Sequence, residues 1–454
     1  METPASVMTR LQQYVAQIHT VELPAEVIQK AKHHILDTLA AMFSGSQLKP
    51  GRFAITYAAQ QGGPPEAQVV GSQLRVSAIN AALANGMLAH SDETDDNHPV
   101  GGLHPGCTVV PAALAMAERE NAGGADFIRA VVFGYDMGCR TIRALGGSLS
   151  LRTRNHLPFS IGGTIGATAA AGSLAGLCLE QVPYLFSFGA QQASGVMTYA
   201  RDTEHIEKAF IFGGMPSRNG VTAATMVKNG FTGVTDVFSG DGNFLLAYSD
   251  KPKPEGLVNE LGSRYEMMTT NIKKYCIGGP IQLPLEGLML IMEEHRIGAQ
   301  DIEQIVVHLE KSGAHTINDR EMPDINLQYL FAITLLDGKL TFDAAHSFER
   351  MKNLDVMDLK ARVRIVADPE LSRILPERHA ILEVVTKDGR MIEKRVTTFR
   401  GNSDNPLSTD EVEKKAGDLI EPILGVHRFR KLLETIDRLE SLPSIRELQP
   451  MLQL

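Results

Sequence analysis

The chain has 454 residues, 43% hydrophobic and 21% charged, which is the balance of an ordinary globular protein of about two domains. Its formal net charge of −9 argues against a nucleic acid or an anionic membrane as partner. The N-terminal segment lacks the pattern of a signal peptide, and no stretch approaches the roughly 20 apolar residues of a membrane helix, so we expect a soluble protein.

Helical periodicity dominates the first part of the chain. Apolar residues at helical spacing predict a helix over residues 27–43, with Gly45 just beyond its end. Residues 77–89 are rich in Ala, Asn and Gly, which predicts a buried helix that packs closely on its neighbours. Further helices are predicted over residues 111–118, 125–145 and 162–177.

Small residues also dominate the helix predicted over residues 162–177. No GxGxxG follows a strand here and no GK[ST] is present, so tight helix packing is favoured over a phosphate-binding loop. The four cysteines form no CxxC pair, which is typical of reduced thiols in a cytoplasmic protein rather than of disulfides or a zinc site. They are Cys107, Cys139, Cys178 and Cys276.

The pattern changes near residue 270. Residues 302–310 and 361–368 are rich in β-branched side chains and predict strands. Residues 380–398 predict a hairpin, in which Asp388 and Gly389 supply a type I′ turn. Helical segments at residues 283–295 and 327–336 lie between the strands.

We therefore predict a mainly α protein with an inserted α+β domain. A helical domain over residues 1–268 precedes an α+β lid domain over residues 269–400, and the helices of residues 401–454 return to the helical domain. Because pockets are common at domain boundaries, we expect the site there.

Residues 90–98 form the densest polar cluster, with four carboxylates and two histidines, and His104 follows. Asp92, Asp95 and Asp96 could supply oxygen ligands to a divalent metal ion. A histidine or carboxylate of the cluster could instead serve acid–base catalysis. An acidic, solvated loop at a helix end is the third interpretation, and the residues alone leave all three open.

Two basic segments could hold an anion. His156 lies beside Arg152 and Arg154 before a predicted helix, where helix N–H groups and guanidinium groups could converge, although an ordinary surface loop fits equally well. Lys208 and Arg218 are flanked by glycines and could bind two carboxylates, but a lysine on a helix is more often solvated. The sequence has no GxSxG, HExxH or spaced Cys/His set, so nothing supports a serine hydrolase or a zinc enzyme.

Several segments occur in an order that is similar to the MmgE/PrpD family, which includes 2-methylcitrate dehydratases, cis-aconitate decarboxylase and iminodisuccinate epimerase. AKHHILDTLAAMFSG resembles one family motif, and AHSDETDDNHPVGGLHPG begins another. The resemblance covers almost the whole chain, through residues 31–45, 89–118, 134–140, 155–177, 192–195, 208–233 and 335–338.

The resemblance implies a helical domain and a lid domain that enclose the site, usually in a homodimer, with no metal and no organic cofactor. By this alignment the family's site positions fall on Glu93, Asn97, His104, His156, Lys208, Lys273 and Tyr329. The sequence departs from the family at Glu93 (usually Asp), at Asn97 (usually Thr) and at Gln282, which replaces a lid histidine. We therefore expect the reaction class to transfer better than the substrate.

The family's chemistry implies removal of a proton next to a carboxylate, which adds negative charge that fixed donors must hold. Family position and side-chain chemistry together assign this clamp to Lys208 and Lys273, with Arg201 and Arg218 as further candidates. His104 is the expected acid/base, since histidine titrates near neutral pH, and His156 is its partner.

Glu93 is expected to orient a histidine or a substrate hydroxyl, and Tyr329 to donate a hydrogen bond or to protonate a leaving group. Asn97 and Gln282 complete the substrate-facing residues. The predicted activity is a lyase on a small di- or tricarboxylate, first a hydro-lyase like 2-methylcitrate dehydratase. An epimerase like that for iminodisuccinate, a cis-aconitate-type decarboxylase and a non-enzymatic polycarboxylate-binding protein are the alternatives.

Overall fold

The computed structural model describes residues 6–375 and 377–454, which form two compact units. The helical unit comprises residues 6–91, Asp95–Asn271 and Ser408–Leu454, and the α+β unit comprises Asp92–Thr94 and Ile272–Leu407. The protein is mainly α with a smaller α+β part, which confirms the predicted fold class. Within the described ranges, no helix combines the length and hydropathy needed to cross a bilayer.

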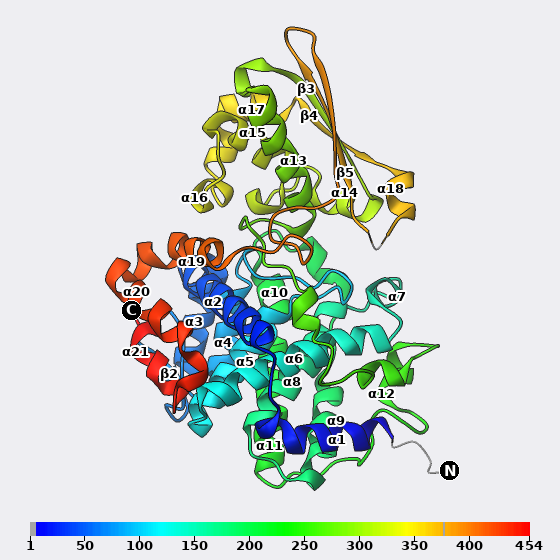
Figure 1. Cartoon of the computed structure of the whole chain (residues 1–454), viewed down its shortest axis with the longest axis vertical. Helices are drawn as coiled ribbons and strands as arrows, with labels where there is room; N and C mark the ends of the chain where they lie inside the picture. The colour runs from blue at the N-terminus through cyan, green and yellow to red at the C-terminus, as the bar shows by residue number, and fades with distance from the viewer. Residues whose placement is uncertain (1–5, 376) are drawn as a thin grey trace. The chain divides into compact units, whose positions relative to one another are not determined.

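In the helical unit, helices from the end of the chain pack against helices from its beginning (Figure 1). Their bounds are α1 Val7–Gln17, α2 Ala25–Gln47, α3 Lys49–Gln61, α4 Ala78–Ala89, α5 Pro105–Glu120, α6 Gly124–Ala144, α7 Ser148–Arg152, α8 Pro158–Leu174, α9 Val182–Gln192, α10 Ile206–Ala209, α11 Met215–Lys228, α12 Phe244–Tyr248, α19 Thr409–Leu424, α20 Val426–Asp437 and α21 Gln449–Leu452. A short two-stranded ladder pairs β1 Ala67–Gln68 with β2 Arg75–Val76.

Helix α2 does not end at Gly45, as the sequence pattern predicts, but continues to Gln47. A Cβ atom at Gly45 would lie 2.0 Å from the backbone oxygen of Leu88 in α4. This glycine therefore serves the close approach of two helices rather than helix termination, and tertiary packing overrides its usual role at a helix end.

The small residues of α8 also serve close packing, as predicted. Helix α8 packs against α6, α5 and α11, and a Cβ atom at Gly166 would lie 2.7 Å from the backbone oxygen of Gly134 in α6. Both helices are buried over most of their length. The stretch is thus a buried helix, and the phosphate-loop alternative does not apply.

Helix α19 brings the end of the chain back onto α2. Its first turn is capped by Ser408 and Glu411 in a capping box. In its interior, Lys415 Nζ lies 2.6 Å from Asp37 Oδ1 of α2, and both side chains are buried. Burial raises the pKa of Asp37 to about 6 even though Lys415 lowers it. This ion pair ties the two ends of the chain together.

The α+β unit contains a sheet in the order β4-β3-β5-β6, in which β3 runs parallel to β4 and antiparallel to β5. The buried side chains of these strands share one core with the helices of the unit. The elements are α13 Gly279–His295, β3 Ile302–Leu309, α14 Lys311–Ile317, α15 Leu327–Asp337, α16 Phe342–Ala345, α17 Leu354–Lys360, β4 Val363–Ala367, α18 Pro369–Arg373, β5 Ala380–Thr386 and β6 Met391–Val396.

The hairpin of β5 and β6 confirms the predicted strand pair, but its turn is not the predicted type I′ turn. A type I′ turn needs positive φ at both central residues, and here only Gly389 has it, at 87°. The Gly389 N–H donates to the Thr386 carbonyl, which is the pattern of a type I turn followed by a glycine bulge. An Asp-Gly pair fits both turns, so its sequence does not choose between them.

A buried carboxylate joins distant parts of the helical unit. Glu266 lies 3.2 Å from His98 Nε2, 2.9 Å from Arg143 Nη1 and 3.1 Å from Arg264 Nη2. Burial alone would raise its pKa, but the hydrogen bond from His98 and the charges of the two arginines lower the pKa of Glu266 to about 2. The ionised form therefore stabilises the fold.

Replacing Glu266 by glutamine should lower the free energy of unfolding at pH 7 by about 2 kcal/mol, allowing for screening at the half-exposed arginines. The folded pKa lies below the ordinary value of 4.5, so this stability is present above pH 4.5 and is lost as pH falls toward 2. Urea unfolding at pH 7 and pH 3 should show a smaller difference between the two proteins at pH 3. The control Glu255→Gln, at an exposed pair with Arg10, should change stability little at either pH.

Candidate functional site

The segment from His90 to Asp96 is buried, with side chains between 0 and 4% exposed. It follows directly on α4 and leads to α5. The interpretation as a solvated acidic loop is therefore wrong, because a carboxylate is costly to bury unless it is paired. Asp92, Glu93 and Thr94 belong to the α+β unit, whereas the residues on either side belong to the helical unit.

In the helical unit, Asp95 lies between two histidines. Its Oδ2 is 3.0 Å from His90 Nδ1, and its Oδ1 is 3.2 Å from His104 Nδ1. Burial would raise the pKa of Asp95, but the two imidazoles beside it hold that pKa well below its ordinary value. The carboxylate is therefore ionised and fixes the orientation of both rings, as carboxylate–histidine pairs do in other enzymes.

Phe212 forms one wall of this cluster. It lies in a π-helical turn, η4 (Phe210–Gly214), a rare element that often occurs at functional sites. Its ring stacks on His90 at 4.6 Å between centroids and lies 5.7 Å from His104. Phe159, in the first turn of α8, contacts both Phe212 and His104.

A third histidine completes the cluster. The ring of His205 lies 5.3 Å from that of His90, and the side chain is buried. Its backbone adopts φ of 60°, a left-handed conformation that is uncommon for a residue other than glycine. Backbone strain of this kind often accompanies functional positions. The sequence analysis did not select His205 or His90, and their place beside His104 appears only in the fold.

Asp96 forms a hydrogen bond at the start of α5, and His104 is the N-cap residue directly before this helix. Its Oδ1 accepts a hydrogen bond from Gly106 N at 2.9 Å. Its Oδ2 accepts from Tyr135 Oη at 2.6 Å and lies 2.7 Å from His34 Nδ1. Burial lowers the pKa of His34 and raises that of Tyr135, so both groups act as neutral donors to Asp96. Asp96 thus stabilises the backbone beside His104.

Lys208 lies close to the same cluster. Its Nζ is 5.4 Å from the centroid of the Phe212 ring, the ring that His90 and His104 also contact. Its backbone N–H donates to Asp202 at 3.0 Å, which anchors the short helix α10. Of the predicted site residues of the helical unit, His104 and Lys208 are therefore brought together around Phe212.

The other predicted residues of the helical unit lie in different surroundings. The ring of His156 is 5.1 Å from that of Tyr248, and His156 lies two residues before the start of α8. Arg201 is exposed, and the guanidinium of Arg218 donates to Asn219 Oδ1 at 2.9 Å. In the predicted anion pocket, Arg152 stacks over Phe159 and Arg154 forms an ion pair with Asp250.

Asn97 pairs with Asn271 through two backbone hydrogen bonds of 3.0 and 2.8 Å. The side-chain Oδ1 of Asn97 is buried and accepts no hydrogen bond from the described residues. A buried amide oxygen without a donor is costly, so this atom is suited to accept a hydrogen bond from a ligand. The predicted substrate-binding role of Asn97 stays a prediction that this geometry supports.

In the α+β unit, Lys273 is buried and donates from Nζ to the backbone oxygen of Glu93 at 2.7 Å, with the Glu93 carboxylate at 3.4 Å. Gln282 donates to the backbone oxygens of Tyr275 and Ile277, so its amide organises the loop before α13. The Tyr329 hydroxyl is buried and donates to a backbone oxygen of its own unit. The roles predicted for these three residues stay predictions.

Among the described residues of the helical unit, one set of side chains offers ligand atoms to a metal ion. Atoms of His90, Asp95 and Cys107 lie within 4.8 Å of one another. However, the Cys107 thiol is 3.3 Å from the His104 carbonyl, a contact in which it donates, and Asp95 is already divided between two imidazoles. These three side chains are therefore better suited to hydrogen bonds and ion pairs than to binding a metal ion.

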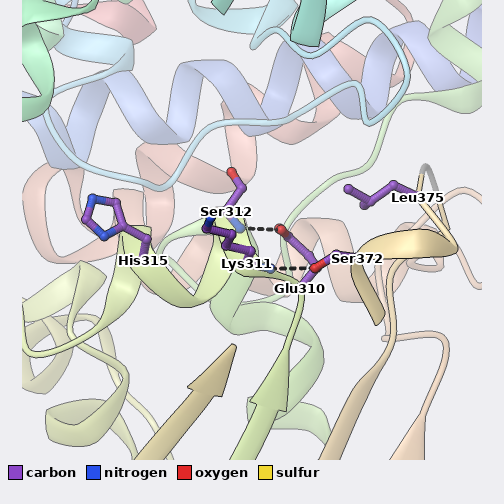
Figure 2. Close-up of a pocket in the computed structure, with 6 residues that line it drawn as sticks. All are labelled: Glu310, Lys311, Ser312, His315, Ser372 and Leu375. Atoms are coloured by element: carbon purple, nitrogen blue, oxygen red, sulfur yellow. Dashed lines mark hydrogen bonds between the residues drawn. The ribbon is translucent and has the colours of Figure 1, made fainter. Parts of the chain in front are cut away.

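A surface pocket of about 320 Å³ lies in the α+β unit (Figure 2). Glu310 caps helix α14 there by accepting from Ser312 N at 2.6 Å, and Lys311 N donates to Ser372 Oγ at 3.0 Å. The side chains of Glu310 and Ser372 thus complete local backbone structure, and none of the predicted site residues lines the pocket.

Comparison with known proteins identifies the family of this chain. The MmgE/PrpD N-terminal domain matches residues 9–257, and the MmgE/PrpD C-terminal domain matches residues 275–441. Three relatives each align over at least 95% of this chain and 91% of their own length. They are the cis-aconitate decarboxylase-like protein oryM of Aspergillus oryzae (26% identical), a cis-aconitate decarboxylase of Aspergillus terreus (25%) and the cis-aconitate decarboxylase of Homo sapiens (25%). The chain therefore belongs to the MmgE/PrpD family, as an enzyme of the lyase type.

Proposed function

We propose that the protein is a lyase that transfers a proton to or from a carbon next to a carboxylate of a small di- or tricarboxylate. The observation that carries this proposal is the buried Asp95 carboxylate, which holds His90 and His104 from Nδ1. In His104 this contact involves Nδ1, so Nε2 is the nitrogen that can exchange a proton with a substrate, and histidine exchanges protons near neutral pH. The cluster thus supplies an acid/base with a fixed tautomer.

In this proposal His104 exchanges the proton with the substrate carbon. The Asp95 carboxylate orients its imidazole and stabilises the imidazolium that forms when Nε2 gains a proton. Lys208, beside the same aromatic wall, stabilises the negative charge that develops on the substrate carboxylate. Asn97 Oδ1 accepts a hydrogen bond from a substrate hydroxyl or carboxylic acid group.

Decarboxylation is the first candidate among the possible outcomes, because the relatives named above are cis-aconitate decarboxylases or similar to them. In this reaction the bond between a carbon and a carboxylate breaks, CO₂ leaves, and the electron pair stays on the carbon chain. A proton from His104 then forms the new C–H bond, so that a tricarboxylate yields a dicarboxylate. Dehydration of a hydroxy acid such as 2-methylcitrate is the second candidate, since the same base can remove the proton next to the carboxylate.

Proton NMR in D₂O distinguishes these outcomes. The purified protein is incubated separately with cis-aconitate, citrate, 2-methylcitrate and iminodisuccinate. We expect cis-aconitate to lose one carboxyl group and to gain one deuterium per molecule. New vinyl signals from a hydroxy acid would establish a dehydratase instead, and deuterium exchange without elimination would establish an epimerase.

The Lys208→Met variant tests the proposed role of the lysine, because methionine keeps the length of the side chain and removes its charge. It should slow the reaction of whichever compound turns over, because Lys208 is proposed to bind the developing charge. Tight binding of a polycarboxylate with no turnover and no solvent exchange would overturn the proposal in favour of a binding protein.

A further inference from the structure

A buried ion pair in the α+β unit involves a histidine that the sequence analysis did not select. His346 Nε2 lies 3.0 Å from Asp92 Oδ2, and its Nδ1 lies 2.8 Å from the carbonyl oxygen of Phe342. The Phe342 carbonyl can only accept, so Nδ1 carries a proton. The Asp92 carboxylate beside Nε2 favours a second proton there, which gives the doubly protonated imidazolium form. The Phe342 ring also contacts the imidazole, at 4.1 Å between centroids.

The charges around His346 agree with this form. Burial lowers its pKa, but the hydrogen bond and charge of Asp92 outweigh burial, and the charge of Asp324 and the Phe342 carbonyl add to them. Together they raise the pKa of His346 to about 9. The side chain is therefore a cation at neutral pH.

The Asp92 carboxylate also accepts two hydrogen bonds from Thr94. Its Oδ1 accepts from the Thr94 backbone N–H at 2.8 Å, and its Oδ2 accepts from the Thr94 hydroxyl at 2.8 Å. These bonds close a tight turn in which Glu93 is the middle residue. Lys273 holds the same residue through its backbone oxygen. The backbone of Glu93 is thus restrained by Asp92 on one side and by Lys273 on the other.

Tyr329 holds the segment that carries His346. Its hydroxyl donates to the Ala344 carbonyl at 2.5 Å, with the Ser347 carbonyl at 3.3 Å, so its two acceptors flank His346 in the sequence. Tyr329 itself is fully buried in the core of the α+β unit. Its backbone N–H is capped by Asn326 at the start of α15. A rigid helix therefore fixes the turn on which His346 lies.

We propose that Tyr329 and His346 are positioning residues that act through Asp92 to fix the conformation of Glu93. Tyr329 orients the His346 turn, His346 pairs with Asp92, and Asp92 closes the turn around Glu93. This inference rests on the proposed function and on the role that the family resemblance implies for Glu93, which is to orient a histidine or a substrate hydroxyl. It gives Tyr329 a role through backbone contacts in place of direct proton donation to a substrate.

The first test needs no substrate. Ring ¹⁵N chemical shifts of the histidines, measured by NMR between pH 6 and 9, should show one imidazole doubly protonated through pH 8. Asp92→Asn should identify this signal as His346 by lowering its pKa. A neutral His346 at pH 7 in the unmodified protein would overturn the proposal, whatever substrate the enzyme uses.

The second test separates positioning from proton donation. Tyr329→Phe should lower kcat about 3- to 10-fold with little change in KM, and His346→Gln about 10- to 100-fold. The double variant should be no slower than His346→Gln alone, because both act through the same turn. If Tyr329 donates the proton itself, Tyr329→Phe should lower kcat at least 100-fold and the two effects should multiply, which would overturn the proposal.

Two matched controls accompany these variants. His308→Gln removes another histidine paired with carboxylates in the α+β unit, at Glu383 and Asp368. Tyr265→Phe removes another hydroxyl that donates to a backbone carbonyl, that of Gly262. Both should leave kcat within about twofold of the unmodified protein.

Discussion

Replacing His104 by glutamine should lower kcat by a factor of about 10²–10⁴ while the protein stays folded. Glutamine preserves much of the side-chain volume and can still reach Asp95, but it cannot exchange a proton. The measurement is the rate of CO₂ loss or of deuterium incorporation with the compound that the NMR panel identifies. Circular dichroism and urea unfolding show whether the fold is retained.

Asp95→Asn tests the same assignment through its partner. The asparagine amide presents an N–H or an oxygen to each imidazole, but it lacks the negative charge of the carboxylate. Because that charge stabilises the imidazolium form, kcat should fall by at least 10-fold. The control is His19→Gln, which breaks an exposed pair with Asp126 and should leave kcat unchanged. Near-normal turnover in His104→Gln would show that another group transfers the proton, and His205 would then be the first candidate.

Gly213→Ala should lower the free energy of unfolding by about 3 kcal/mol and also reduce kcat. A Cβ atom at Gly213 would lie 2.0 Å from the backbone oxygen of Gly86 in α4, and backbone cannot move aside as a side chain can. The higher helix propensity of alanine relative to glycine would offset no more than about 1 kcal/mol of this loss of stability. Because Phe212 precedes Gly213, moving the π-helical turn away from α4 would also disturb the stacking of Phe212 on His90.

Urea unfolding measures the loss of stability, and steady-state kinetics measures the loss of turnover. The control is Gly256→Ala, where the nearest atoms would lie 3.5 Å or more from the new Cβ, an ordinary contact. This variant should stay within about 0.5 kcal/mol of the unmodified protein. A Gly213→Ala protein as stable as the control would show that α4 and the turn can separate at little cost.

The elements of the fold could largely be predicted, because periodicity reports burial directly. Ser77, the N-cap of α4, and the apolar runs of β3 and β4 stand where the sequence pattern predicts them. The errors fall where tertiary contacts decide between local alternatives. Gly45 lies inside α2 because α4 approaches it, and α5 starts at Pro105, six residues before the predicted start at Pro111.

The candidate site could be predicted less completely. The polar segment around residue 93 and His104 stood out because many charged residues lie together in a chain that is otherwise apolar there. His205 and His346 each lie alone in the sequence, and a single histidine carries no signal of its partner. Their contacts with His90 and Asp92 join positions 115 or more residues apart, which only the folded chain brings together. Backbone strain at His205 was equally invisible, since φ cannot be read from residue type.

The ion pair between Lys415 and Asp37 has a consequence for biosynthesis. The two residues are 378 positions apart, so at roughly 5–20 residues per second a ribosome needs about 20–75 s to make the second after the first. During that time the face of α2 that α19 later covers has no permanent neighbour, and Asp37 has no cation. The nascent protein therefore passes through a state in which this face of α2 is exposed to solvent and accessible to chaperones. Substitutions on α19 should reduce yield in cells more than they reduce the stability of the finished enzyme.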